Sequence, residues 1–92
     1  MKTLSLVKRS SRGKTIKIDL TIDEENKVIK DIVVSGDFFA YPPEKLEELE
    51  DKLKNKHVSE VDRVIDGYRD ILELVGAPLD DLKELVKKPF QE

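Results

Sequence analysis

The chain has 92 residues, 40% of them charged, and a formal net charge of −3 at pH 7. Its length fits a single domain, residues 1–92, with one modest hydrophobic core. It contains no cysteine, which excludes disulfides and thiolate metal ligands, and no run of about 18 apolar residues that could cross a membrane. The apolar stretch after Met1 is too short for a signal peptide, so the cytoplasm is the simplest location.

Charge is distributed unevenly along the chain. Residues 1–22 carry six basic side chains and one acidic side chain, a net charge of +5, whereas residues 23–92 carry 11 basic and 19 acidic side chains, a net charge of −8. A basic segment can steer a domain toward an acidic partner or bind nucleic acid. Residues 1–36 contain no aromatic side chain on which bases could stack, which favours a partner-facing or solvated segment. The candidate steering residues are Lys8, Arg9, Arg12 and Lys14.

The first third of the chain predicts strands. From Thr15 to Asp23 apolar and polar residues alternate strictly, which indicates a strand with one face on a core and the other in water. A weaker alternation at residues 4–6 precedes it, separated by a turn that contains Gly13. A polar connector then leads to residues 28–35, in which five of the eight side chains are apolar. These segments predict a three-stranded antiparallel meander.

The remainder of the chain predicts about three helices. Pro42 and Pro43 suit a helix start, and leucines follow at helical spacing. A second helix is predicted from Ser59, which can serve as an N-cap, along an apolar stripe that ends at Val75. A third short helix follows Pro78. Helices on one face of a small sheet give an α+β fold, a two-layer sandwich.

The sequence lacks the residue sets that stand-alone catalysis needs. His57 is the only histidine, so neither a histidine metal cluster nor a catalytic triad can be assembled. The four glycines are scattered and form no phosphate-binding loop. The carboxylates lie mostly on predicted solvent-facing helix surfaces, and the serines suit turns and caps. We therefore predict no catalytic residue and no metal site in this chain.

The most distinctive segment joins the third predicted strand to the first helix. Three of the five aromatic residues, Phe38, Phe39 and Tyr41, fall within four positions. Neighbouring residues of an extended chain point in opposite directions, so one phenylalanine can enter the core while the other faces outward. The residues alone leave two interpretations open, a plug for the core or an aromatic anchor for a partner. Gly36 permits a bend or a positive φ, and Asp37 can bond nearby amides.

This segment, Gly36-Asp37-Phe38-Phe39 followed by Tyr41-Pro42-Pro43 and a leucine-rich helix, resembles the C-terminal accessory domain of lipoate–protein ligases. The similarity extends upstream to the hairpin at residues 13–22 and downstream to the final helix at residues 82–86. Some members of that family join a large catalytic domain to this small domain, and others divide the two into separate proteins. The resemblance implies that this chain is the small subunit of a bipartite lipoate–protein ligase.

The resemblance also implies a division of labour. The large catalytic subunit would be the direct partner and would hold ATP, lipoate and Mg, while this chain would bind no cofactor directly. The accessory subunit would be required for ATP-dependent formation of lipoyl-adenylate, and lipoyl-domain acceptor proteins would be met only indirectly. No catalytic residue carries over, and because Met1 nearly begins the first strand we expect a non-covalent association. The expected partner interface consists of Gly36, Asp37, Phe38, Phe39 and Tyr41.

Two other functions remain open on the residues alone. Similar small α+β scaffolds serve as protein-binding modules in sulfur and iron–sulfur assembly, although the missing cysteines argue against direct sulfur handling. A nucleic-acid-binding module would instead bind oligonucleotides with a steep dependence on salt. The accessory-subunit interpretation predicts no nucleic acid, no membrane contact, and a stable complex with one protein.

Overall fold

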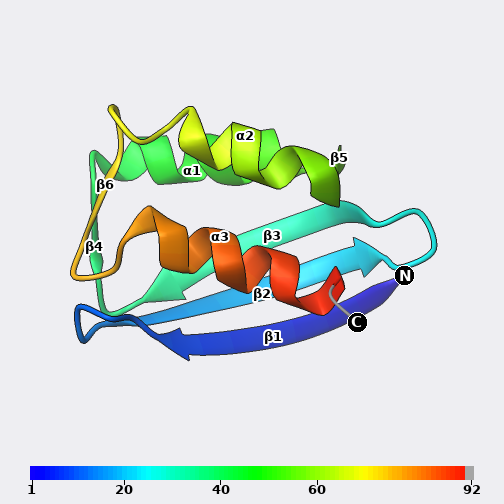
Figure 1. The fold of residues 1–92 in the computed structure, drawn as a ribbon, viewed down its shortest axis with the longest axis horizontal. Coiled ribbons are helices and arrows are strands. Elements are labelled where there is room, and N and C mark those ends of the chain that lie inside the picture. The colour runs from blue at the N-terminus through cyan, green and yellow to red at the C-terminus, as the bar shows by residue number, and fades with distance from the viewer. Residues whose placement is uncertain (91–92) are drawn as a thin grey trace.

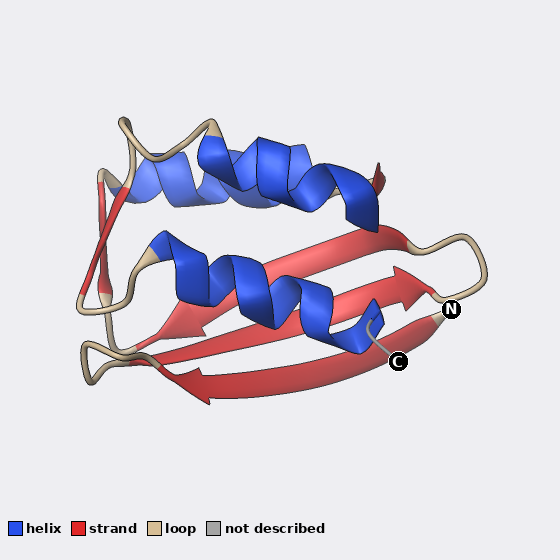
Figure 2. Ribbon diagram, in the orientation of Figure 1, coloured by secondary structure: helices blue, strands red, loops and turns tan. Residues whose placement is uncertain are grey.

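The structure, a computed structural model, describes residues 1–90 and has two layers, an antiparallel sheet and a layer of helices (Figure 1). Figure 2 shows that the helices all lie on one face of the main sheet. The strands are β1 (Lys2–Arg9), β2 (Thr15–Asp23), β3 (Val28–Gly36), β4 (Phe39–Tyr41), β5 (Lys56–His57) and β6 (Glu73–Val75). The helices are α1 (Pro43–Leu53), α2 (Val61–Asp66) and α3 (Leu79–Lys87), with short 3-10 helices η1 (Val58–Glu60) and η2 (Lys88–Phe90). The predicted two-layer α+β class is confirmed.

The main sheet has the strand order β1-β2-β3-β5, and every pairing in it is antiparallel. The predicted three-stranded meander is therefore confirmed. β5 extends it beyond β3 and was not predicted, because two residues, Lys56 and His57, are too few to show a period. A separate two-stranded sheet pairs β4 with β6 at one end of the molecule (Figure 1).

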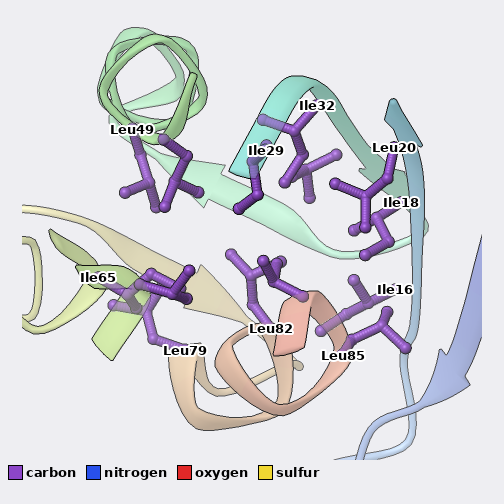
Figure 3. Close-up of a cluster of buried hydrophobic side chains, with 14 of the residues drawn as sticks. Ile16, Ile18, Leu20, Ile29, Ile32, Leu49, Ile65, Leu79, Leu82 and Leu85 are labelled. Atoms are coloured by element: carbon purple, nitrogen blue, oxygen red, sulfur yellow. The ribbon is translucent and has the colours of Figure 1, made fainter. Parts of the chain in front are cut away.

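The core lies between the main sheet and the helices. Strict alternation in β2 sends one set of its apolar side chains toward the helix layer, and β3 adds Ile29, Ile32 and Val34 to the same face, with a register shift between Ile29 and Ile32. There they meet leucine, isoleucine and valine from α1, α2 and α3 (Figure 3). The opposite face of the sheet, which includes Val33, is left to solvent. The largest fully buried side chains are Ile16, Ile18, Leu20, Ile22, Ile29, Ile32, Leu49, Leu53, Val61, Ile65, Leu82 and Val86.

The predicted second helix, Ser59–Val75, is wrong in its length. α2 ends at Asp66, and Gly67 caps its C-terminus by donating its N–H to carbonyls of the last turn. The apolar stripe nevertheless continues, because Tyr68 and Leu74 are buried from a turn and from β6 rather than from a helix. Helical and turn-plus-strand conformations can bury the same short series of positions, so the pattern could not separate them.

A buried serine fastens the β1–β2 turn to α3. Ser10 donates from Oγ to Asp81 Oδ2 at 2.8 Å and accepts at 3.1 Å from the N–H of Arg12. Asp81 also accepts at 3.4 Å from the N–H of Ser11 and lies 3.4 Å from the Nζ of Lys8. Burial alone would raise the pKa of Asp81, but the hydrogen bonds from Ser10, Lys8 and Ser11 outweigh burial and hold this pKa below its ordinary value. The β1–β2 turn, residues 10–14, which we call the basic turn, is therefore held against the helix layer.

Asp81→Asn is expected to lower the free energy of unfolding near neutral pH by about 1–3 kcal/mol, because it removes charge-assisted hydrogen bonds. Since the folded pKa of Asp81 lies below the unfolded one, its contribution is present above the unfolded pKa and is lost as pH falls through the folded pKa. The stability difference from wild type should therefore shrink below about pH 4, which urea unfolding at several pH values measures. Asp70→Asn, at an exposed carboxylate, should change stability by no more than about 0.5 kcal/mol. A difference for Asp81→Asn that stays constant down to about pH 2 would contradict the assignment.

Candidate partner interface

Gly36 and Asp37, which we call the joint, turn the chain out of β3 toward β4. Gly36 has a φ of +152°, which L side chains rarely adopt, and a β carbon there would lie 2.1 Å from the carbonyl oxygen of Thr15. The N–H of Thr15 donates to Oδ1 of Asp37 at 2.6 Å. The predicted bend and the predicted amide contact are thus both present. Gly36 and Asp37 fasten the end of β3 to the start of β2.

Phe38 and Phe39 leave this joint in opposite directions, as their adjacency predicts. Phe38 is partly buried, packs against the core, and has its ring close to Gly36. Phe39 is 70% exposed, and Tyr41, two residues further along β4, is 71% exposed. Residues two apart on a strand share a face, so both outward rings lie on one side of β4. The core-plug interpretation therefore holds for Phe38, whereas Phe39 and Tyr41 face solvent, which is the position that a partner anchor would require.

Pairing with β6 extends this aromatic surface. Phe39 lies opposite Val75 and Tyr41 lies opposite Glu73, and directly opposed residues project from the same face. Val75 is 44% exposed, whereas Leu74 on the other face is buried. We call the surface formed by Phe39, Tyr41, Glu73 and Val75 the aromatic ribbon. The sequence does not predict its two β6 members, because the apolar stripe places residues 73–75 in a helix and three residues carry too little alternation to indicate a strand.

The basic turn lies next to the aromatic ribbon. The N–H of Lys14 donates to the carbonyl of Gly76 at 3.3 Å, and the Lys14 side chain passes so close that a β carbon on Gly76 would lie 2.3 Å from its Cγ. Figure 1 shows the β1–β2 turn, β4 and β6 at the same end of the molecule. The outward aromatic rings and the basic turn, which contains Arg12, are therefore neighbours. In the sequence they are two separate groups of candidate residues. Exposed aromatic side chains beside basic ones are a common composition of protein interfaces.

The predicted steering residues fall into two groups. Lys8 lies against α3, with its Nζ 2.6 Å from Glu84 and 3.4 Å from Asp81, so its charge is balanced within the chain. The hydrogen bond to Glu84 raises the pKa of Lys8 although burial opposes it. Arg9, Arg12 and Lys14 are exposed and make no ion pair within residues 1–90.

A shallow depression of about 340 Å³ is lined by Arg12, Arg69 and Glu73, the last of which belongs to the aromatic ribbon. Arg69 is hydrogen-bonded to Asp66 at 2.9 Å and also to Asp80. Carboxylates thus balance one of the two arginines, which does not suit a nucleotide triphosphate. Within residues 1–90 no three His, Asp or Glu side chains are grouped as metal ligands, and no helix there is long and apolar enough to span a bilayer.

Over residues 5–85 the sequence matches the family described as "Bacterial lipoate protein ligase C-terminus". The chain therefore belongs to this family of ligase C-terminal domains, and the resemblance carried by the segment from Gly36 to Phe39 is confirmed.

Two relatives are more specific. The chain is 35% identical over 51 residues to lipoate-protein ligase A subunit 2 of Thermoplasma acidophilum, a match that covers 55% of this chain and 54% of that protein. The match thus spans about half the length of that relative. A solved structure described as a bi-partite lipoate protein ligase and its E2 lipoyl domain, from the same organism, aligns with a TM-score of 0.75 and 26% identity, covering 92% of this chain and 97% of the solved chain.

Proposed function

We propose that this chain is the non-catalytic accessory subunit of a bipartite lipoate–protein ligase. Together with a large catalytic subunit it would be required for ATP-dependent formation of lipoyl-adenylate, and hence for protein lipoylation. The observation that carries the proposal is the structural match, over 92% of this chain, to a chain from a bi-partite lipoate protein ligase. The family match over residues 5–85 supports it.

The chemistry of the described residues supports a docking role. Neither the depression beside Arg69 nor any group of carboxylates within residues 1–90 fits ATP or a metal ion. ATP, lipoate and Mg would therefore bind to the large subunit, and this chain would act through docking. The exposed rings of Phe39 and Tyr41 instead offer the rigid aromatic anchors on which protein–protein contacts depend.

Docking can promote adenylation through the conformation of the large subunit. Lipoyl-adenylate is a mixed anhydride that water hydrolyses, so its formation benefits from a closed site. A domain that binds the closed state more tightly than the open one shifts the population toward closure. A shift from 1:99 to 99:1 requires about 5.5 kcal/mol of differential binding. An interface of about 800 Å² per partner, the usual size for a specific complex, is large enough to supply this.

The test is an adenylation assay with the two separately purified proteins. With ATP and lipoate, release of pyrophosphate should be at least about tenfold faster when both chains are present, because the accessory subunit raises the closed population. Transfer from preformed lipoyl-adenylate to a lipoyl domain should proceed on the large subunit alone, since the acceptor meets this chain only indirectly. Size-exclusion chromatography should show a one-to-one complex. If the large subunit alone adenylates lipoate at the full rate, the proposal fails.

A further inference from the structure

The two edges of the main sheet differ. Beyond β3 lie β5, which pairs with Val28 and Ile29, and the carboxylate of Glu50, which accepts a hydrogen bond from the N–H of Val34 at 2.6 Å. Beyond β1 no strand pairs within residues 1–90. β1 is eight residues long, has no bulge against β2, and carries no charge from Thr3 to Val7. A long, regular edge with an uncharged centre of this kind readily accepts a further strand.

The alternation of the ladder identifies the unpaired backbone groups of β1. Val34 donates its N–H to α1, so its backbone points away from β2, and its partner Ile18 points toward β1. Ile18 pairs with Leu6, so the backbone groups of Leu6 point toward β2. Ser10, also even-numbered, points the same way, because its N–H donates across the turn to the carbonyl of Lys14. Even-numbered residues of β1 therefore bond to β2, and odd-numbered residues direct N–H and C=O to the open edge. The outward residues are Thr3, Ser5, Val7 and Arg9.

A side-chain pocket accompanies this edge. It has a volume of about 220 Å³, lies between β1 and α3, and is lined by Val7, Lys8, Glu84, Leu85 and Lys88. Lys8 and Glu84 are paired with each other, whereas Lys88 makes no ion pair within residues 1–90. A strand added to β1 would send alternate side chains to the helix side of the sheet, where one apolar side chain could enter the pocket.

We propose that β1 is a strand-addition site, and that its occupant is an extended segment of the large catalytic subunit. This rests on the proposed function. The segment would bond to the outward N–H and C=O groups of β1, place one apolar side chain in the pocket beside Leu85, and present acidic residues to Arg9 and Lys88. The edge reaches the basic turn at Arg9, so it is continuous with the aromatic ribbon beyond that turn (Figure 1).

Charge argues against a second copy of this chain as the occupant. β1 carries Lys2, Lys8 and Arg9 and no acidic residue. Lys8 is paired with carboxylates of α3, but Arg9 makes no ion pair within residues 1–90. Two fully overlapping copies of β1 would place Arg9 opposite Lys2 if antiparallel, or opposite the other Arg9 if parallel, and like charges opposed across strands are unfavourable. An acidic strand from a different chain meets no such penalty.

The test compares two substitutions at one outward position. Val7→Pro removes an outward N–H without removing a bond to β2, a position at which an edge strand tolerates proline. Val7→Ala makes a similar loss of side chain but keeps that N–H. We expect Val7→Pro to weaken the complex with the large subunit at least about tenfold and Val7→Ala to weaken it less than about threefold, measured by titration calorimetry after circular dichroism has shown that both variants fold.

A second measurement uses the unaltered chain, so it does not depend on how well the proline variant folds. In the free chain, the amides of Thr3, Ser5 and Val7 should exchange quickly, and those of Leu4 and Leu6 slowly. Complex formation should protect the first set. If a complex forms and adenylation needs both chains, yet these amides stay unprotected and both variants bind alike, β1 is not the site while the proposed function stands. If no complex forms, both proposals fail; protection that rises with the concentration of the free chain alone would indicate self-pairing and overturn the inference.

Discussion

Replacing Phe39 and Tyr41 together by alanine is expected to weaken the complex with the large subunit at least about 100-fold, with the fold intact. Each ring is about 70% exposed in the free chain, so its removal takes little from the core. A buried aromatic anchor in an interface typically contributes about 2 kcal/mol or more, and two of them together exceed the 2.8 kcal/mol that corresponds to a factor of 100. Adenylation by the mixture should fall in parallel at subsaturating concentrations of this chain.

Two controls separate docking from folding. Val33→Ala changes a 50% exposed apolar residue on the solvent face of the main sheet, away from β4 and β6, and should leave affinity within about twofold. Phe38→Ala should instead lower the melting temperature, because this ring packs against the core. Unchanged affinity of the Phe39→Ala, Tyr41→Ala variant, in a chain that melts like wild type, would remove the aromatic ribbon from the interface.

The main sheet could be predicted because each of its residues adds to the same local signal. From Thr15 to Asp23 nine residues share one period of two, and the structure forms β2 over those same positions. The second half of the chain was harder to predict, because its buried residues do not follow one period. Leu74 reaches the core from a three-residue strand whose partner, Ala40, lies more than thirty positions earlier. Pairing over such a separation leaves no trace in a short window of sequence.

The candidate interface could be predicted only in part, because the local sequence does not fix the direction in which the chain leaves β3. Adjacency alone shows that Phe38 and Phe39 diverge, but it does not show which ring faces outward. The backbone conformation of Gly36 and the contact of Asp37 with Thr15 decide that, by setting the direction in which the chain leaves β3. For Lys8, the sequence shows the charge but not the residues that neutralise it. Its charge counts toward a basic segment, yet in the fold it is matched by carboxylates from a helix more than seventy residues away.

Gly36→Ala is expected to destabilise the domain by about 3 kcal/mol or more, a large part of the 5–15 kcal/mol that holds a typical domain together. Two effects combine. The positive φ strains any L side chain, and the new β carbon would meet the carbonyl of Thr15 at 2.1 Å and the Phe38 ring at 2.8 Å. Because a backbone oxygen in a paired strand cannot move aside as a side chain can, the joint itself must shift, and β4 with the aromatic ribbon must shift with it.

Two other glycines make this a graded test, measured by urea unfolding. Gly13 also has a positive φ, +95°, but a β carbon there has nothing within 4 Å, so Gly13→Ala should cost only the backbone strain of about 1–2 kcal/mol. Gly67 has a β-carbon position 3.4 Å from its nearest neighbour and no positive φ, so Gly67→Ala should lie within about 0.5 kcal/mol of wild type. If Gly36→Ala is no worse than Gly13→Ala, the steric contact with Thr15 does not exist in solution, and the joint does not set the direction of β4. The order of the three variants therefore tests the geometry that separates Phe38 in the core from Phe39 at the surface.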